Sequence, residues 1–286
     1  MKILVTGGYG QLGRSLLKNI NKNMQILRTG KNVPVEEKGI DLDILDRKNL
    51  QEVIHLCSPD ILINLAALTD VDLCEKNQFL AHEINTKGVK NICDVFNGKI
   101  IQISTDYVFN GEKGPYSEDD QVEPLSVYGA TKLEAEKIVM SHNSGNLILR
   151  SNVLYDYNTR SKASFLNWVV KSLKQKKPIK VVNDQINNPT WTESMAKTIF
   201  RCIENNINGI YHWGDAEFLS RYDFALKIAR GYKLDTGLIS PILTKELNQI
   251  APRPLNSGLK PDKILKLLDI HQPSINECLE KIILSL

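Results

Sequence analysis

The chain has 286 residues, of which 42% are hydrophobic and 24% charged, and its formal net charge is +3. This composition is typical of a soluble globular protein, and the charge is too small to favour nucleic acid or a membrane surface as a partner. Five widely spaced cysteines without a C-x-x-C pair argue against a metal site or disulfide framework, and for reduced thiols in the cytoplasm. The sequence shows no signal-peptide pattern and no apolar run long enough to span a bilayer.

Strand and helix patterns alternate over the first 155 residues. Buried-strand patterns are found at 1–8, 24–30, 60–67, 99–105 and 146–155, and helical apolar spacing at 11–20, 47–57, 79–96 and 127–141. Such alternation predicts an α/β fold with a Rossmann-type doubly wound parallel sheet covered by helices on both faces.

The pattern is looser in the second half of the chain. Helices are predicted at 164–177, 192–205, 220–232 and 274–286, and strands at 179–184 and 209–214. We therefore expect a cofactor-binding domain over 1–155. A smaller C-terminal α+β substrate lobe is expected over 156–286, partly interleaved with the first domain and forming one wall of a cleft.

The first strand leads into a glycine-rich turn that opens a helix. Glycines in this context let the backbone approach a pyrophosphate, while the helix N-terminus offers amide groups and a positive dipole. The spacing Gly-x-x-Gly-x-x-Gly predicts a dinucleotide-binding loop, although an ordinary turn is the alternative. The candidate cofactor residues in this loop are Gly7, Gly10, Gln11, Leu12 and Gly13.

The end of the second strand bears on the choice of cofactor. An acid there would favour NAD, but the segment contains Arg28, Thr29 and Lys31 instead. We expect NADPH to be preferred over NADH, with NADH use left open; the alternative is that these cations merely face water. Further candidates near the cofactor, which are equally compatible with packing, are Asp43, Ile44, Ala66 and Ala67.

A tyrosine and a lysine stand four residues apart on the helix predicted at 127–141. Tyr128 and Lys132 lie on one helix face, and Thr105 ends the fourth strand, where ligands bind in open α/β sheets. The phenol can donate a proton to a substrate oxygen, and the lysine is expected to lower the phenol pKa toward the working pH. With hydride from the cofactor, these groups would reduce a ketone to an alcohol; a solvated helix face is the alternative.

Together, the glycine motif, Thr105 and Tyr128-x-x-x-Lys132 resemble the extended short-chain dehydrogenase/reductase superfamily. The segments "GGYGQLG", "NLAALTDVDLCE", "ISTDYVFNG", "DQINNPTWT" and "RPLNSGL" narrow this resemblance to the dTDP-4-dehydrorhamnose reductase family along almost the whole chain. The resemblance implies NAD(P)H-dependent reduction of the 4-keto group of a nucleotide-linked 6-deoxysugar, giving dTDP-L-rhamnose for cell-surface polysaccharide. It also implies that Thr105, Tyr128 and Lys132 are catalytic, and that Tyr128 and Lys132 lie near the cofactor.

The same resemblance implies a set of substrate-binding residues. Those expected near the sugar or its nucleotide are Thr69, Val71, Thr105, Asp106, Tyr107, Gln185 and Arg253. Arg253 is a reasonable diphosphate partner, with a surface arginine beside two prolines as the alternative. Val153 stands where the family usually has a pocket tryptophan, so the sugar and the nucleotide base are left open.

The sequence therefore leaves three functions open. The first is a dTDP-4-dehydrorhamnose reductase, and the second is a reductase of a CDP-, GDP- or UDP-linked 4-ketosugar, prompted by Val153. The third is a non-catalytic NADP-binding regulatory subunit, similar to the β subunit of methionine adenosyltransferase. A homodimer is left open, and the expected partner is a nucleotide-sugar substrate.

Overall fold

The computed structural model describes residues 1–157 and 164–286. Its centre is a parallel sheet of seven strands in the order β11-β6-β5-β4-β1-β2-β3. In chain order these are β1 (Lys2–Thr6), β2 (Gln25–Gly30), β3 (Ile40–Asp41), β4 (Ile61–Asn64), β5 (Lys99–Thr105), β6 (Leu147–Ser151) and β11 (Gly209–Trp213). The order reverses beside β1, which confirms the predicted doubly wound α/β fold and places a crevice beyond the carboxyl ends of β1 and β4.

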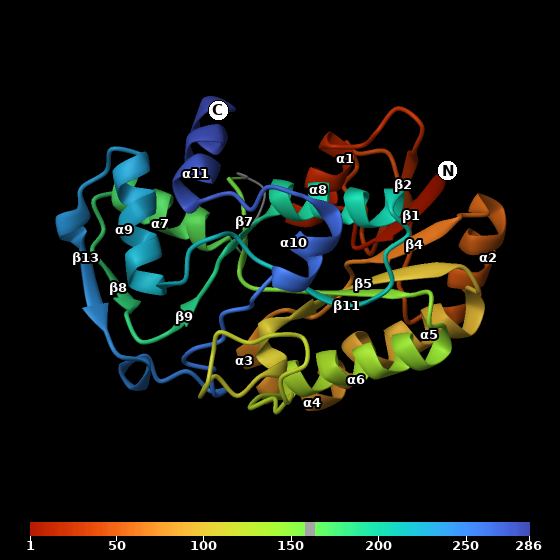
Figure 1. Cartoon of the computed structure of the whole chain (residues 1–286), viewed down its shortest axis with the longest axis horizontal. Helices are drawn as coiled ribbons and strands as arrows, with labels where there is room; N and C mark the ends of the chain where they lie inside the picture. The colour runs from red at the N-terminus through yellow and green to blue at the C-terminus, as the bar shows by residue number, and fades with distance from the viewer. Residues whose placement is uncertain (158–163) are drawn as a thin grey trace.

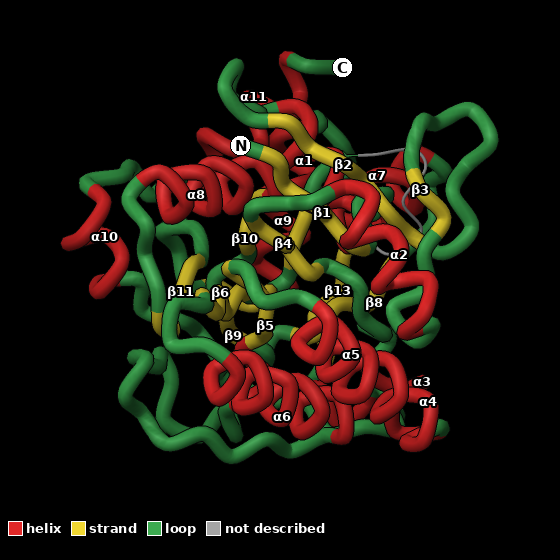
Figure 2. The backbone as a smooth tube through the Cα atoms, turned by 90° about the vertical axis from the view of Figure 1, so that its right-hand side faces the viewer, coloured by secondary structure: helices red, strands yellow, loops and turns green. Residues whose placement is uncertain are grey.

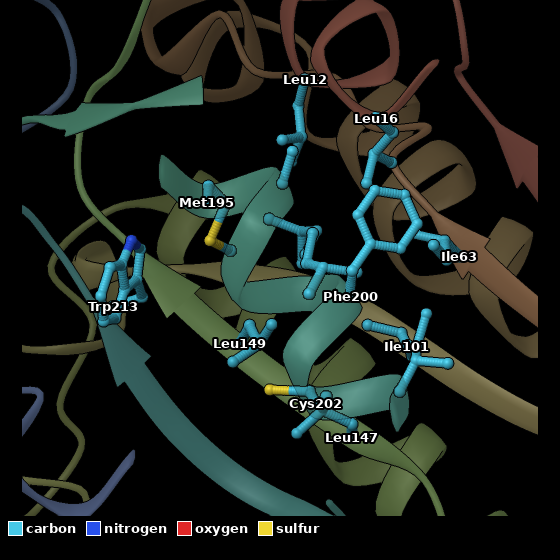
Figure 3. Close-up of a cluster of buried hydrophobic side chains, with 14 of the residues drawn as sticks. Leu12, Leu16, Ile63, Ile101, Leu147, Leu149, Met195, Phe200, Cys202 and Trp213 are labelled. Carbon is cyan, nitrogen blue, oxygen red and sulfur yellow. The ribbon is translucent and has the colours of Figure 1, made fainter. Parts of the chain in front are cut away.

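Helices cover both faces of this sheet (Figures 1 and 2). One face carries α1 (Gln11–Lys18), α8 (Thr192–Glu204) and α10 (Asp262–Leu268), and the other carries α2 (Arg47–Cys57), α5 (Gly88–Val95) and α6 (Val127–His142). Figure 3 shows the first of these interfaces, where Phe200 of α8 lies against Leu16 of α1 and Ile63 of β4. The strands alternate their apolar side chains between the two faces, so each face buries its own core.

The connection between β4 and β5 is more broken than the sequence predicts. The helix expected over 79–96 is divided into α4 (Gln78–His82), a π-helical turn (Glu83–Lys87) and α5, and it is preceded by the short helix α3 (Val71–Lys76). Asp70 and Asn77 start α3 and α4, since their side chains accept hydrogen bonds from the backbone N–H of Leu73 and Leu80. This pair of short helices lies beside α6, and α3 brings Val71 to the edge of the crevice.

A second apolar core lies in the C-terminal half. It is built by α7 (Phe165–Lys174), α9 (Arg221–Gly231) and α11 (Ile275–Leu284), packed around the parallel pair β8 (Ile179–Val182) and β13 (Ile239–Ile242). Figure 1 shows these elements gathered at one end of the molecule. The remaining elements are short: β7 (Leu154–Tyr155), β9 (Ile186–Asn187), β10 (Thr190–Trp191), β12 (Leu219–Ser220) and 3₁₀ turns at Asp106–Val108, Thr236–Leu238 and Thr244–Glu246.

The chain passes between the two cores more than once. Although β11, α8 and α10 belong to the C-terminal half of the sequence, they pack on or extend the seven-stranded sheet. The division at residue 155 stays a prediction, and the returning segments show where the two halves of the chain are interwoven. Within residues 1–157 and 164–286, no helix combines the length and the apolar character needed to cross a membrane.

Candidate active site

A cavity of about 600 Å³ opens at the carboxyl ends of β1, β4, β5 and β6. Its volume is in the range of small-molecule sites, and it occupies the crevice at which open α/β sheets bind ligands. The predicted site residues that line it are Gly7, Gly10, Gln11, Leu12, Gly13, Ala66, Ala67, Thr69, Val71, Thr105, Asp106, Tyr107, Tyr128, Lys132 and Val153. Cofactor and substrate candidates from distant parts of the sequence therefore share one cavity.

The glycine loop has the features that a dinucleotide needs. Gly7 has φ +63°, and a Cβ there would lie 2.7 Å from the backbone nitrogen of Ala66, so only glycine fits. Gly10 is the N-cap of α1 and brings no side chain to cap it, which leaves the first amides of the helix directed at the cavity. The buried Oε1 atom of Gln11 has no hydrogen-bond partner among the described residues. These unpaired donors and this unpaired acceptor fit a bound pyrophosphate and nicotinamide.

Thr105 and Tyr128 are brought together by β5 and α6. The Ser126 hydroxyl caps α6 by accepting from the Gly129 backbone N–H at 3.2 Å, which places Tyr128 in the first turn. The Thr105 side chain hydrogen-bonds the Tyr128 phenol, and the Tyr107 ring packs edge-on against Tyr128 with centroids 5.6 Å apart. The phenol is thus held at the cavity wall.

The electrostatics of the pair differ from the expectation. Burial raises the pKa of Tyr128, and the hydrogen bond between Tyr128 and Thr105 opposes that rise only in part. Burial also lowers the pKa of Lys132 to about 8, against the opposing charge of Glu136. The Nζ of Lys132 donates to the backbone oxygen of Ile103 at 2.6 Å, so its cation is engaged with β5. The predicted lowering of the phenol pKa is wrong for this arrangement, because burial is the largest cause of the shift and the Lys132 ammonium is bonded to the Ile103 oxygen.

Asp106 and Asn152 are buried polar residues that line the same cavity as Thr105 and Tyr128. Asp106 is fully buried and its carboxylate accepts hydrogen bonds from Thr105 at 3.1 Å and from Ser257 at 2.5 Å. Burial raises the pKa of the Asp106 carboxyl, and the hydrogen bond from Ser257 opposes this rise. Asn152 donates to the Ser257 backbone oxygen at 2.9 Å, while its buried Oδ1 has no partner among the described residues. That Oδ1 is an acceptor available to a substrate hydroxyl.

The predicted residues of the adenosine end lie outside the cavity lining. Arg28 forms an ion pair with Glu37 at 2.8 Å, and Lys31 forms one with Asp43 at 2.9 Å. The end of β2 itself contains no acid, but the loop after β2 brings Glu37 back beside Arg28. The hydroxyl of the buried Thr29 donates to the Val5 oxygen at 3.3 Å. Ile44 is buried in the core beneath α5, which favours the packing interpretation for this residue.

Two predicted substrate residues, Gln185 and Arg253, are not part of the cavity lining. Gln185 donates to Thr244 at 3.1 Å and to Gln249 at 3.3 Å, outside the cavity lining. Arg253 is held by Asp72 at 2.9 Å and by the Ala251 backbone oxygen at 2.7 Å, with only 8% of its side chain exposed. The ion pair ties the C-terminal loop to α3, and the role of Arg253 as a diphosphate partner stays a prediction.

The cavity also contains residues that the sequence analysis missed. Two come from the C-terminal lobe: Phe165 at the start of α7 and Arg221 at the start of α9, with the guanidinium carbon 5.5 Å from the phenyl centroid. No local pattern identifies them, because their position depends on how the lobe packs. The others extend strands whose ends had been recognised, so the strand-end rule could have found them: Leu65, Ile103, Ser104, Ser151, Asn152 and Leu154.

No group of three or more histidine, cysteine, aspartate or glutamate side chains is placed to hold a metal ion among the residues that the structure describes. All five cysteines are free and buried. Burial raises the pKa of the Cys74 and Cys93 thiols to about 11, so these groups are not reactive thiolates at neutral pH.

The comparison with protein families decides the assignment. The model of the RmlD substrate binding domain matches residues 1–286. The chain belongs to the RmlD family. The predicted family resemblance, and with it the nucleotide-sugar reductase class, is confirmed.

Individual relatives of the RmlD family agree along nearly the whole chain. The dTDP-4-dehydrorhamnose reductase of Aggregatibacter actinomycetemcomitans is 32% identical over 96% of this chain and 95% of its own length. The solved structure of dTDP-4-dehydrorhamnose reductase from Bacillus anthracis str. Ames in complex with NADP has a TM-score of 0.91 and 30% identity, covering 100% of this chain and 99% of that one. The methionine adenosyltransferase 2 subunit β of Xenopus laevis is 30% identical over 93% of this chain and 82% of its own.

Proposed function

We propose that this protein reduces the 4-keto group of a nucleotide-linked 6-deoxysugar with NADPH, and that its substrate is dTDP-4-dehydrorhamnose. The observation that carries the proposal is the single cavity in which the glycine loop, Thr105, Tyr128 and Lys132 meet. The relative from Bacillus anthracis, solved with NADP, supports the choice of cofactor.

The proposed chemistry needs one hydride and one proton. A nicotinamide cofactor held by the glycine loop, from Gly7 to Gly13, would supply the hydride for the carbonyl carbon. Tyr128 gives its phenolic proton to the carbonyl oxygen, and its raised pKa keeps that proton in place at neutral pH until charge develops on the oxygen. Thr105 orients the phenol through their hydrogen bond, and the buried Lys132, which lines the same cavity, supplies positive charge.

The substrate is recognised from the opposite wall of the cavity. Lys132 and Arg221 carry the positive charges among the described residues that line it, and Arg221 comes from the lobe side. A guanidinium matches the geometry of phosphate oxygens, so we assign the diphosphate to Arg221 rather than Arg253. Phe165 offers an aromatic ring to the same cavity that is lined by Val153, the residue that stands in place of the usual family tryptophan.

The deciding experiment is NADPH oxidation by the purified protein with dTDP-, CDP-, GDP- and UDP-linked 4-ketosugars, followed by identification of the product. The proposal expects the highest kcat/KM for dTDP-4-dehydrorhamnose and a lower kcat/KM with NADH. A higher kcat/KM for another nucleotide would keep the reductase and reject the sugar assignment. Absence of turnover with the whole panel would reject the reductase.

The likeness to a methionine adenosyltransferase subunit supports a second candidate, a cofactor-binding regulatory protein. In that case NADP would bind while no ketosugar is turned over. Mixing the protein with a methionine adenosyltransferase catalytic subunit separates the two candidates: a reductase leaves the kinetics of that enzyme unchanged, whereas a regulatory subunit alters them.

A further inference from the structure

Three charged side chains form a compact cluster beside the glycine loop. Arg14 of α1 pairs with one carboxylate oxygen of Glu37 at 2.6 Å, and Arg28 of β2 pairs with the other at 2.8 Å. Only 10% of the Glu37 side chain and 11% of the Arg28 side chain are exposed. The carboxylate thus bridges two guanidinium groups, and its pKa stays below the usual value because both arginines donate hydrogen bonds that outweigh the effect of burial.

The loop that carries Glu37 is held in place by Tyr9 of the glycine loop. The Tyr9 ring lies 4.7 Å from the Arg28 guanidinium carbon, and its hydroxyl is 3.4 Å from the backbone oxygens of Arg28 and Lys38. A Cβ at Gly30 would lie 2.9 Å from the Tyr9 ring, and one at Gly39 would collide with the Tyr9 hydroxyl. Both glycines let the loop close over the ring, so the position of Glu37 is fixed by packing as well as by charge.

This cluster lies where the adenosine end of a dinucleotide is expected. Arg28 lies two residues before the end of β2, and a Cβ on Gly8 of the glycine loop would be 2.9 Å from the Arg28 Cβ. Arg14 is one turn into α1, whose N-terminus faces the pyrophosphate. In this fold the ribose 2′ substituent is read at the end of the second strand, by an acid for a hydroxyl or by an arginine for a phosphate.

We propose that Glu37 sets the discrimination between NADPH and NADH, because it pairs with the two arginines that a 2′-phosphate would need. A 2′-phosphate must displace the carboxylate from both guanidinium groups and is repelled by it. A cofactor with a free 2′-hydroxyl finds in the same carboxylate a hydrogen-bond acceptor. Glu37 therefore reduces the factor by which the protein binds NADPH more tightly than NADH. This inference rests on the cofactor half of the proposed function and is independent of the sugar.

The test is calorimetric binding of NADP⁺ and NAD⁺ to the whole protein without sugar. Glu37→Gln keeps the shape of the side chain and removes its charge. The expected result is a rise of at least tenfold in the ratio of the NAD⁺ to the NADP⁺ dissociation constant. The matched control is Glu52→Gln on α2, whose side chain is 66% exposed and 3.9 Å from its lysine partner, and which should leave the ratio unchanged.

Arg28→Gln supplies an independent arm in case Glu37→Gln lowers stability. Because it removes a phosphate partner, the same ratio should fall at least fivefold. An unchanged ratio in both variants, or equal loss of affinity for the two nucleotides, would overturn the role of Glu37 while leaving the reductase proposal intact. If the unmodified protein binds neither nucleotide, the proposed function fails, and the inference fails with it.

Discussion

Burial dominates the chemistry of individual site residues. Tyr128 has a raised pKa and Lys132 a lowered one, and in both cases desolvation is the largest cause. Because each shift favours the neutral form, the site is arranged for a phenol that keeps its proton and a lysine that loses its charge in mildly alkaline solution. Both properties are testable on single side chains.

Removal of the phenolic hydroxyl should stop the proton transfer. Tyr128→Phe keeps the ring that packs against Tyr107 and should lower turnover of the 4-ketosugar by roughly 10² to 10⁴, the range for a lost general acid. Steady-state NADPH oxidation measures the effect, and Tyr211→Phe, in β11, is the control that should retain full turnover. Near-normal turnover by Tyr128→Phe would show that another group donates the proton.

The charge of Lys132 predicts the alkaline limb of the pH profile. Burial lowers the pKa of Lys132 to about 8 in the free enzyme, so its positive charge is complete below that pH and is lost as the pH rises through it. We expect kcat/KM, which reports on the free enzyme, to fall above pH about 8. Lys132→Arg should be slower but should lose this limb, because a guanidinium stays charged. A profile that is flat to pH 10 in the unmodified enzyme would contradict the assignment.

A comparison of Arg221, which lines the cavity, with Arg253, which does not, tests which arginine binds the substrate diphosphate. A hydrogen bond to a charged group contributes about 1.5–3 kcal/mol, so Arg221→Gln should raise the KM for the nucleotide sugar roughly 10- to 150-fold. Arg253→Gln breaks the ion pair with Asp72 outside the cavity and should act on thermal stability, with little change in KM. Initial-rate kinetics on both variants decide the matter, and the reverse pattern would restore Arg253 as the diphosphate partner.

Among the structural elements, the strand–turn–helix unit around the glycine loop shows how two glycines of one motif differ. Gly7 adopts a positive φ against the backbone of Ala66, whereas Gly10, at φ −72°, has its nearest atom 3.5 Å from an added Cβ. The two glycines look equivalent in the motif, but the structure assigns them different reasons for being glycine.

That difference predicts different costs for adding a methyl group. Gly7→Ala combines left-handed strain with a backbone clash and should lower the free energy of unfolding by at least about 1–3 kcal/mol. Gly10→Ala should cost less, since it changes only the N-cap preference of α1. Denaturant unfolding without cofactor compares them directly, and equal losses would contradict the strain argument.

The elements also show where sequence reasoning succeeds and where it stops. The long alternating segments and the family motifs predicted the parallel sheet and most of the cavity wall, since the strand ends define that wall. The strand expected over 146–155 is divided in two at Asn152 and Val153, which turn into the cavity; the apolar pattern runs through this bend and hides it. Arg221 and Glu37 were missed because their roles depend on partners distant in the sequence or on a returning loop.

At the scale of the whole molecule, the two cores differ in how they bear on the site. The sheet core fixes the cofactor loop and the catalytic side chains. The lobe core holds Phe165 and Arg221, and fully buried Phe224 stacks on Phe165 with ring centroids 5.5 Å apart. Packing in the lobe therefore sets the substrate wall.

A cavity in the lobe should consequently weaken both stability and substrate binding. Phe224→Ala should lower the free energy of unfolding by about 3–5 kcal/mol, the usual cost of emptying a buried phenylalanine site. Phe79→Ala on α4 removes a ring that is 76% exposed and should stay within about 0.5 kcal/mol. Chemical unfolding gives the stabilities, and calorimetry with the nucleotide sugar gives the binding. A Phe224→Ala variant as stable as Phe79→Ala would show that the lobe adapts to the loss.

The position of β11 has a consequence for how the chain is made. This strand pairs with β6 from Gly209 to Trp213, so the sheet begun at Lys2 is completed only after about three quarters of the polypeptide has been synthesised. Until then a nascent chain carries β6 as an open edge with the apolar residues Leu147, Ile148 and Leu149. Truncation of the gene near residue 155 should therefore yield an aggregating fragment rather than an independent nucleotide-binding module, and ribosome-bound chains of that length are natural clients for chaperones.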